Sequence, residues 1–382
     1  MQKVFFRKSI YFLLAVSVAC SSLAMSATME QLEQRLSVLE EELKLTQEEA
    51  ADSAERINNA VMIGGYADVE YVKTNDTAMM GGFRMHHLSL MFKKQVSDDL
   101  KFFSEFEYED GPWMDGTDGA NAILVEALNF DYSFSNATTI RVGRFFTPAG
   151  IWSVDHYPPF VSTQDKPQHI RLIFPQLTDG VSLTGNHAVG DAFLSYNLYA
   201  GNGETSNFNG KQDSNRDLAK GLRVNLSLPF AQVLDIGATY YTEKMTDPAL
   251  GAVDPASDKQ AFGVHAKIRQ GNVGVQAEYA DGKYEPTVVV VPAATLAPVY
   301  HRKGYYAQLS YDIDQWTVGY RYDFYDPDSN AALDNTKINS LIVNYHVDKN
   351  TVLKWEHHLL NLEDPASKDY YRSIGSIVVN FD

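Results

Sequence analysis

The sequence predicts an all-β fold, a transmembrane antiparallel β-barrel of about 16 strands, preceded by a short helical segment. Tyrosine and phenylalanine number 22 and 20 among 382 residues, yet no stretch beyond the N-terminus is apolar for long enough to form a membrane helix. From residue 61 onward, apolar and polar residues alternate in segments separated by turns. The connections between these segments alternate between short and long, as the turns and loops of a membrane barrel do.

Residues 1–24 are typical of a secretory signal peptide. Three basic side chains lie among the first eight residues, an apolar stretch follows at 10–19, and Ser22-Leu23-Ala24 offers a small-residue cleavage site. The competing interpretation is a membrane helix, but the apolar stretch is well short of the roughly 20 residues that a span needs. Cys20 is the only cysteine and would leave with the signal, so we expect no disulfide and no cysteine-ligated metal.

Residues 28–58 predict a periplasmic coiled coil. Apolar residues recur there at spacings of three and four, which is the seam of a coiled coil of about four heptads, at Met29, Leu32, Leu36, Leu39 and Leu43. A single amphipathic or partly disordered helix is the alternative. The stretch 28–60 carries nine acidic residues against three basic ones, and the whole chain has a formal net charge of −17. This acidity argues against nucleic acid as a partner, because phosphate binding needs a basic surface.

The barrel is expected at 61–382. Short links are predicted at 94–99, 135–137, 186–191, 229–232, 270–272, 312–314 and 348–350. Long ones are predicted at 73–84, 110–121, 147–179, 202–220, 243–259, 282–302, 326–337 and 361–370. A secreted β-sandwich would also show strands in which apolar and polar residues alternate, but its short and long loops would not alternate strictly along the chain. The short links, and the coiled coil with them, are assigned to the periplasm.

Successive side chains of a strand point to opposite faces of the sheet. If the apolar face of each strand faces lipid, the residues at the other alternate positions, which have the opposite parity, line the lumen. The basic residues of that parity are Lys93, Lys101, Arg141, Arg223, Lys267, Arg269, Arg321, Lys354 and Arg372. The acidic ones are Asp68, Glu70, Glu105, Glu107, Glu109, Asp131, Glu278, Asp323 and Glu356. The wall is therefore nearly neutral, and ion preference should be set by the narrowest ring.

The longest connection, 147–179, is the candidate for a loop that folds inward and narrows the pore. Lys166 and Arg171 are its candidate anion contacts, together with His156 and His169. These side chains could equally be solvated charges on an outer loop. Arg144 has lipid-facing parity, where it could snorkel toward the interface or contact the phosphates of lipopolysaccharide.

Nothing in the sequence indicates an enzyme. It contains no Gly-rich phosphate loop and no G-x-S-x-G element. His86-His87 and His357-His358 are adjacent pairs, whose members should point to opposite faces of a strand and so not share a metal. We therefore predict no catalytic residue, no metal and no cofactor. A few lumen-face aromatics, such as Tyr66, leave a sugar-conducting pore open as a weak alternative.

Residues 139–159 read TIRVGRFFTPAGIWSVDHYPP and residues 175–185 read PQLTDGVSLTG. With the acidic heptad segment before the barrel, these stretches resemble the phosphate-selective porin family of the porin O and porin P type. The resemblance covers most of 61–382 in layout, but only the surroundings of Arg144, Phe145, Pro148 and Gly150 are motif-like. It implies a trimeric barrel of 16 strands with inward-folded loops and passive uptake of anions, phosphate among them. The arginine ladder of characterised anion-selective members cannot be placed here.

The predicted function is thus an outer-membrane porin for passive diffusion of small hydrophilic solutes in a Gram-negative bacterium. The resemblance favours anion or phosphate selectivity, whereas the charges favour general diffusion or a weak cation preference. Less favoured functions are a structural outer-membrane tether and an outer-membrane hydrolase. Expected partners are membrane lipid and lipopolysaccharide, the solute, and two further copies of the chain. The candidate pore residues are Arg141, Arg223, Lys267, Arg269, Arg321, Lys354, Lys166 and Arg171.

Overall fold

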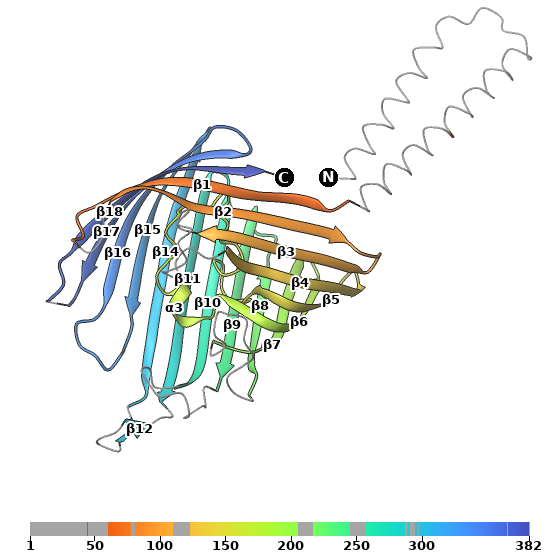
Figure 1. The fold of residues 1–382 in the computed structure, drawn as a ribbon, viewed down its shortest axis with the longest axis horizontal. Helices are drawn as coiled ribbons and strands as arrows, with labels where there is room; N and C mark the ends of the chain where they lie inside the picture. The colour runs from red at the N-terminus through yellow and green to blue at the C-terminus, as the bar shows by residue number, and fades with distance from the viewer. Residues whose placement is uncertain are drawn as a thin grey trace, which may run out of the picture. The chain divides into compact units, whose positions relative to one another are not determined.

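In the computed structural model of the chain, 16 strands close into one antiparallel barrel in which β1 pairs with both β2 and β18 (Figure 1). The structure describes residues 44, 60–77, 81–109, 123–204, 217–244, 257–286, 289–290, 295–296, 298–364 and 366–381. The predicted signal peptide and coiled coil lie outside this set and stay predictions. Among the described residues, no helix is long and apolar enough to cross a bilayer.

Each strand pairs with its neighbours along the chain, so the barrel is a continuous meander. The first eight strands are β1 (Met62–Thr74), β2 (Gly82–Gln95), β3 (Leu100–Glu109), β4 (Ile123–Ser135), β5 (Thr138–Phe146), β6 (Leu177–Val189), β7 (Ala192–Gly201) and β8 (Ala219–Ser227). The other eight are β9 (Val233–Glu243), β10 (Ser257–Gln270), β11 (Val273–Pro286), β14 (Tyr300–Ile313), β15 (Trp316–Asp326), β16 (Thr336–His346), β17 (Thr351–Leu362) and β18 (Tyr370–Phe381). Two elements do not belong to the barrel sheet, α3 (Ile170–Ile173) and a small sheet of β12 (Val289–Val290) and β13 (Thr295–Leu296).

The predicted alternation of short and long connections is confirmed. Tight turns join β4 to β5, β6 to β7, β10 to β11 and β14 to β15, and longer connections follow the odd-numbered strands up to β11. Gly190 and Gly271 open two of the tight turns with φ values of +60° and +56°. Two-residue hairpin turns whose twist matches the strands need such positive φ values, which glycine adopts without steric cost.

The outer surface of the barrel is apolar, as the period-two pattern predicted. Side chains of lipid-facing parity are exposed along the strands even though they are large and apolar, for example Leu341 at 51%, Trp316 at 47% and Trp355 at 44%. Such a surface would be costly in water and is stable in a bilayer. The opposite parity points into the barrel, so the charged candidates of the sequence analysis are placed on the inner wall.

Candidate functional site: the constriction of the barrel

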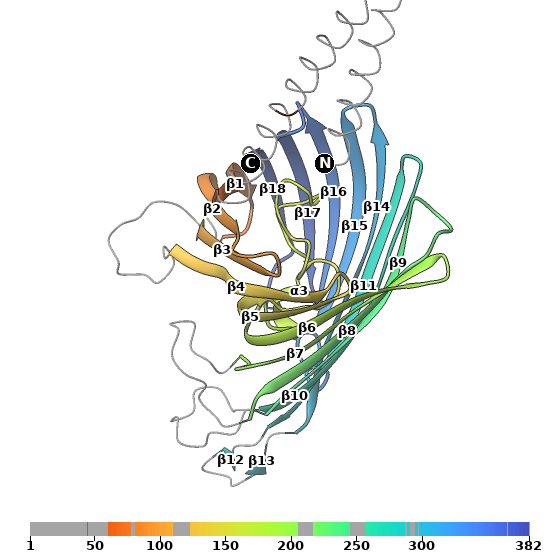
Figure 2. The same cartoon turned by 90° about the vertical axis from the view of Figure 1, so that its right-hand side faces the viewer.

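The connection between β5 and β6, residues 147–176, folds into the barrel and crosses its lumen (Figures 1 and 2). We call it loop 3, because it is the third long connection. Its backbone and side chains bond to strands on both sides of the ring, from Glu105 of β3 to Glu278 of β11 and Glu356 of β17. Loop 3 is therefore the constriction, and the alternative of a solvated outer loop is wrong.

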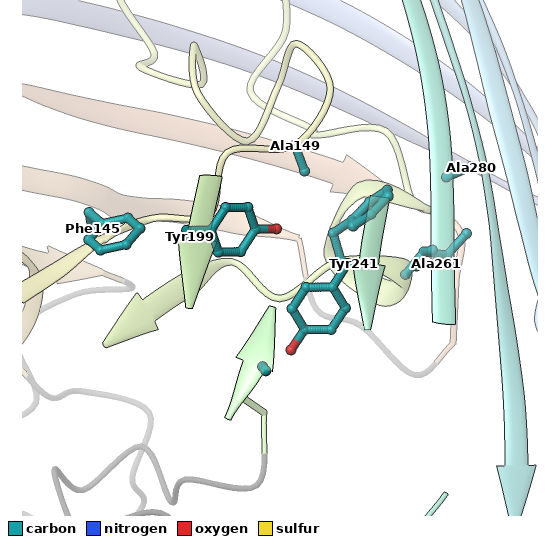
Figure 3. Packing of buried hydrophobic residues seen from close by; sticks show 9 residues of the cluster. Phe145, Ala149, Tyr199, Tyr241, Ala261 and Ala280 are labelled. Carbon is teal, nitrogen blue, oxygen red and sulfur yellow. The ribbon is translucent and has the colours of Figure 1, made fainter. Parts of the chain in front are cut away.

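An apolar cluster attaches the start and end of loop 3 to the wall (Figure 3). Ala149, Ile173 and Phe174 of loop 3 pack against Tyr199, Tyr241 and small residues of the wall, and each is at most 5% exposed. A second contact joins Trp152 to Tyr306 of β14. Burying this apolar area inside a polar lumen stabilises the inward position of the loop.

Wall carboxylates hold the loop backbone. Both oxygens of Glu278 accept backbone hydrogen bonds, from Ile151 at 2.8 Å and Trp152 at 3.2 Å. Glu356 accepts another from the backbone N–H of Gln164 at 2.8 Å. These are charge-assisted bonds in a buried setting, where they are stronger than neutral ones. Two acids that we assigned to the pore lining thus serve to position loop 3.

Three of the predicted pore cations also anchor loop 3. Lys354, 4% exposed, donates from Nζ to the carbonyls of Pro158 and of Val161, the latter at 2.7 Å. Arg321, 1% exposed, pairs through Nε with Asp323 at 2.8 Å and donates to the hydroxyl of Thr163 at 2.5 Å. Arg223 donates to the carbonyl of Gly150 at 3.1 Å. Lys354 and Arg321 are therefore largely enclosed by loop 3, although each still lines a cavity, and their role as anion contacts stays a prediction.

Of the remaining candidates, Arg141, Lys267 and Arg269 line cavities and lie beside acids. Arg141 forms a bidentate pair with Asp131, at 2.7 Å for both contacts, and Arg269 pairs with Asp312. Nζ of Lys267 lies 3.4 Å from Oδ2 of Asp155 of loop 3. Each of these charges faces an acid, which reduces its field on a passing anion. Lys166 lines a cavity, while the Arg171 side chain lies outside what the structure describes.

Two large cavities flank loop 3. The outer cavity, of about 410 Å³, lies at the strand ends that lead to long connections and includes Arg84, Glu109, Lys166, His358 and Arg372 in its lining. The inner cavity, of about 590 Å³, lies near the tight turns and includes Lys93, Lys101, Phe103 and Arg141. Tyr157 of loop 3 lines the inner cavity. Smaller cavities of about 250 and 330 Å³ also lie between loop 3 and the wall, beside Lys267, Arg269 and Lys354.

Two β-bulges place extra polar residues in the lumen that strict alternation assigned to the lipid face. The register between β1 and β2 shifts at Asp68/Val69, which leaves His86 as the additional residue. The register between β3 and β4 shifts at Glu105/Phe106, which leaves Glu126 as the additional residue. Because a bulge inserts one extra residue into a strand, the side chains before and after it no longer share one continuous alternation.

The first bulge overturns one prediction about the histidine pairs. His86 and His87 both point inward, with ring centroids 3.7 Å apart, instead of facing opposite sides of β2. The second pair behaves as predicted: His358 is buried against Ser340 and Glu356 inside, whereas His357 stacks beside Trp355 on the outer face. The difference is the bulge, which β17 lacks.

The second bulge completes a cluster of three buried carboxylates, Glu105, Glu107 and Glu126, each of which offers an oxygen within 4.8 Å of the others. Tyr66 donates to Glu107 at 2.5 Å and Ser89 donates to Glu105 at 2.6 Å. Tyr157 of loop 3 donates to Glu105 at 3.3 Å. The wall opposite loop 3 is therefore strongly acidic at β3 and β4, which the near-neutral count over the whole wall did not reveal. We call Glu105, Glu107 and Glu126 the carboxylate cluster.

Several lesser expectations are corrected. Arg144 makes a bidentate pair with its cross-strand neighbour Asp179, at 2.6 Å for both contacts, in place of an unpaired snorkelling side chain. His156 and His169 are 5% and 1% exposed, so neither is available to an anion. Among the lumen-face aromatics, Tyr66 and Tyr306 are buried at 2% and 1% exposed, whereas Phe103 lines the inner cavity.

Acid should release loop 3 in two stages. Burial, helped by the charge of Arg321, lowers the pKa of His169 from its ordinary 6.5 to about 3. Protonation therefore favours the released loop progressively below pH 6.5, by roughly 2 to 3 kcal/mol at pH 4.5. Burial opposes ionisation of Asp165, but Arg372, His358 and Arg321 outweigh it and lower its pKa. That contribution is present above the ordinary carboxyl range and is lost below about pH 4.

Limited proteolysis of loop 3 and current noise in a planar bilayer, both followed from pH 7.5 to 3.5, would measure this release. In His169→Gln the change between pH 6.5 and 4.5 should disappear, while the change below pH 4 should remain. In Asp165→Asn, loop 3 should already be loosened at neutral pH. The change below pH 4 should disappear in this variant, while the change between pH 6.5 and 4.5 should remain. Identical pH profiles for the wild type and His169→Gln would contradict the assignment.

A closed membrane barrel with one long connection folded across its lumen defines a channel-type outer-membrane protein. A family model described as Gram-negative porin matches residues 14–360, and the chain belongs to this family. It is thus a protein of the outer membrane, and its family and fold are those of a channel rather than an enzyme.

A stretch of 156 residues is 30% identical to an uncharacterized protein of Aquifex aeolicus (strain VF5), and covers 40% of this chain and 35% of that one. The chain thus matches about a third of the length of this curated relative.

Among solved structures, the chain is similar to an anion-selective porin from Comamonas acidovorans, with 15% identity, a TM-score of 0.64, and coverage of 84% of this chain and 99% of that one. Salmonella typhi OmpF in complex with daunomycin follows at 19% identity and a TM-score of 0.60, with coverage of 85% and 98%. The trimer form of OmpT of Vibrio cholerae matches at 12% identity and 0.57, with coverage of 84% and 99%. Identities this low show a shared fold alone.

Proposed function

We propose that this chain is a passive channel that lets small hydrophilic solutes cross the outer membrane. The observation that carries the proposal is the position of loop 3 between an outer cavity of about 410 Å³ and an inner one of about 590 Å³. A structural tether needs no lumen with a built constriction. Loop 3 is held by buried charged bonds from several strands, so the narrow part has a defined shape and charge.

The charges at the constriction favour cations over anions. The carboxylate cluster lies on the wall that Tyr157 of loop 3 touches, and its three acids repel one another. The three side chains are at most 4% exposed, so they would act on a passing cation through their field, which low polarity strengthens, and not by direct contact. By contrast, Arg141, Arg269 and Lys267 each face an acid. We therefore favour general diffusion with a preference for cations.

Anion or phosphate transport is the second candidate, and specific observations favour it. The sequence resembles phosphate-selective porins, and the similar structure from Comamonas acidovorans is described as anion-selective. The inner cavity is also lined by Lys93, Lys101 and Arg141. An anion that entered from the periplasmic side would meet these cations before it reached loop 3.

We also propose that the channel works as a homotrimer, as the trimer form of the similar Vibrio cholerae protein suggests. The exposed apolar side chains of the strands would contact lipid and the neighbouring subunits. The predicted contact with lipopolysaccharide, and the predicted division into signal, coiled coil and barrel, are kept as part of this proposal. The coiled coil at 28–58 would lie in the periplasm.

Reversal potentials in a planar bilayer test the function directly. In a tenfold KCl gradient we expect discrete conductance steps and a potential of cation-selective sign, unchanged by millimolar phosphate. A potential of anion-selective sign, or block of chloride current by phosphate, would support the second candidate. Absence of any conductance from folded trimer would reject the channel and favour a tether, and a lipase assay on the same sample would test for a hydrolase.

The candidate cations of loop 3 can be tested in the same way. Replacing Lys166 and Arg171 together by glutamate should raise the preference for cations several-fold if their charges act at the constriction, since a few charges dominate a narrow low-dielectric passage. The matched control is Lys337→Glu, because Lys337 pairs with Glu363 at the rim and lines neither of the two large cavities. Equal potentials for the double variant and the wild type would exclude this role for loop 3 charges.

A further inference from the structure

The bulge between β1 and β2 builds a group of donor atoms that the channel function does not require. It turns His86 into the lumen beside His87, next to Asp68 and Glu70 of β1. Asp68, Glu70 and His87 are buried, and the His86 side chain is 12% exposed. Asp68, His86 and His87 each offer a ligand atom within 4.8 Å of the others.

Each imidazole is oriented by a carboxylate. Nδ1 of His87 lies 3.0 Å from Oδ2 of Asp68, and Nδ1 of His86 lies 2.9 Å from Oε1 of Glu70. A proton on Nδ1 that is donated to a carboxylate leaves Nε2 as the lone-pair nitrogen of the neutral ring. Histidines that bind metals in proteins are held in this way, because the carboxylate fixes the tautomer and raises the basicity of the other nitrogen.

The two Nε2 atoms converge on a third donor. Each lies 3.9 Å from Oε1 of Glu109, the last residue of β3. Ligands of a tetrahedral zinc ion, bound at about 2.0–2.2 Å, are separated by about 3.3–3.6 Å, so each Nε2 lies within about half an ångström of that separation from Glu109. The Glu109 side chain is 27% exposed and lines the outer cavity with both histidines, so it has room for a shift of that size.

We propose that His86, His87 and Glu109 bind a divalent transition-metal ion such as zinc at the outer mouth of the channel, with Asp68 and Glu70 as positioning residues. Three protein ligands leave the fourth position to water from the outer cavity, so the site would exchange its metal. Two imidazoles and one carboxylate favour zinc or copper over calcium or magnesium, which prefer oxygen ligands. The site uses none of the three acids of the carboxylate cluster, although it lies beside them, since Glu109 follows Glu107 by two positions on β3, and the proposal does not depend on conduction.

The electrostatics suit a dication. Asp68, Glu70 and Glu109 supply three carboxylates around the two imidazole rings. Arg84 pairs with Glu70 at 2.8 Å and offsets one of them. Lys166 lines the same cavity and would disfavour a second cation there. We therefore expect one ion for each chain.

Calorimetry with zinc chloride on the folded full-length protein in detergent, after treatment with a chelator, tests the proposal. One zinc per chain should bind, and cobalt at the same site should give the visible absorption of a tetrahedral complex that zinc removes. His86→Gln and His87→Gln should each weaken zinc binding at least about 100-fold, and Asp68→Asn about 10-fold, as loss of a ligand and of a positioning carboxylate do. Calcium should not compete.

His357→Gln is the matched control, since it changes one member of the other adjacent pair, on the outer face of β17, and should leave zinc affinity unchanged. Should the His86 and His87 variants fail to fold, diethyl pyrocarbonate modification of the wild type gives the answer, because bound zinc should protect both rings. Absence of zinc binding at micromolar concentration would overturn the proposal. Unchanged binding in both folded variants, or no protection of the two rings, would do so as well.

Discussion

Replacing Arg321 by methionine should lower the free energy of unfolding of the barrel by about 3–5 kcal/mol, because it leaves a buried carboxylate without its partner. The side chains of Arg321 and Asp323 are each 2% exposed, and Nε of Arg321 lies 2.8 Å from Oδ2 of Asp323. The same guanidinium bonds Thr163 and lies over the ring of Trp152, at 5.8 Å from its centre. Its loss should therefore also loosen the middle of loop 3 and raise conductance noise.

Three variants distinguish the effect of breaking the buried Arg321–Asp323 pair from that of breaking an ordinary exposed ion pair. Arg269→Met removes one partner of a pair whose side chains are 41% and 33% exposed, and should cost no more than about 1 kcal/mol. Arg321→Met combined with Asp323→Leu should recover most of the lost stability, because no unpaired charge remains buried. Denaturant unfolding in detergent micelles measures all three. Equal losses for Arg321→Met and Arg269→Met would show that burial of the pair is unimportant.

The strands and the parity of the loops were predictable because they depend on local patterns. A residue every second position must face lipid, so Leu341, Val343 and Tyr345 reveal the strand β16 and its outer face. Turn residues such as Gly190 and Gly271 mark where the chain reverses. These signals need no knowledge of distant residues, and the structure confirms them.

The bulges could have been suspected from the chemistry of the residues they displace. Strict alternation puts Glu126 on the lipid face with Leu128, and His86 there with Leu88. A carboxylate or an imidazole facing hydrocarbon is costly, so each position indicated a break in register. Arg144 and Asp179 also have lipid-facing parity, but they neutralise each other across adjacent strands. A polar residue at a position that strict alternation assigns to the lipid face therefore indicates either a β-bulge or a partner of opposite charge on the adjacent strand.

The division of the lumen cations into anchors and exposed charges could not be predicted from the sequence. Lys354 and Arg321 have the same parity as Arg141 and Lys267, and only the path of loop 3 distinguishes them. The decisive contacts join residues 158 to 196 positions apart, such as Arg321 with Thr163 and Lys354 with Pro158. Local patterns carry no information about such pairs, because they depend on where a 30-residue connection returns to the wall.

Replacing Glu105 and Glu126 by glutamine should lower the ratio of potassium to chloride permeability about tenfold. The cluster is buried, so a passing ion feels its field at a distance; two unit charges about 8 Å apart interact by about 2 kcal/mol at an effective dielectric constant of 20, and a tenfold change needs about 1.4 kcal/mol. Glutamine keeps the shape of both side chains, and Glu107 keeps its bond from Tyr66. Reversal potentials in a KCl gradient measure the ratio.

Glu363→Gln serves as the control for that measurement, because Glu363 is an exposed acid that pairs with Lys337 outside the constriction. It should change the permeability ratio less than twofold, since salt screens an exposed charge at the rim. The double variant should also keep the single-channel conductance within about twofold, because no side chain changes in volume. If its reversal potential equals that of the wild type while conductance is normal, ions pass loop 3 by another route, and the cations of the inner cavity become the next residues to replace.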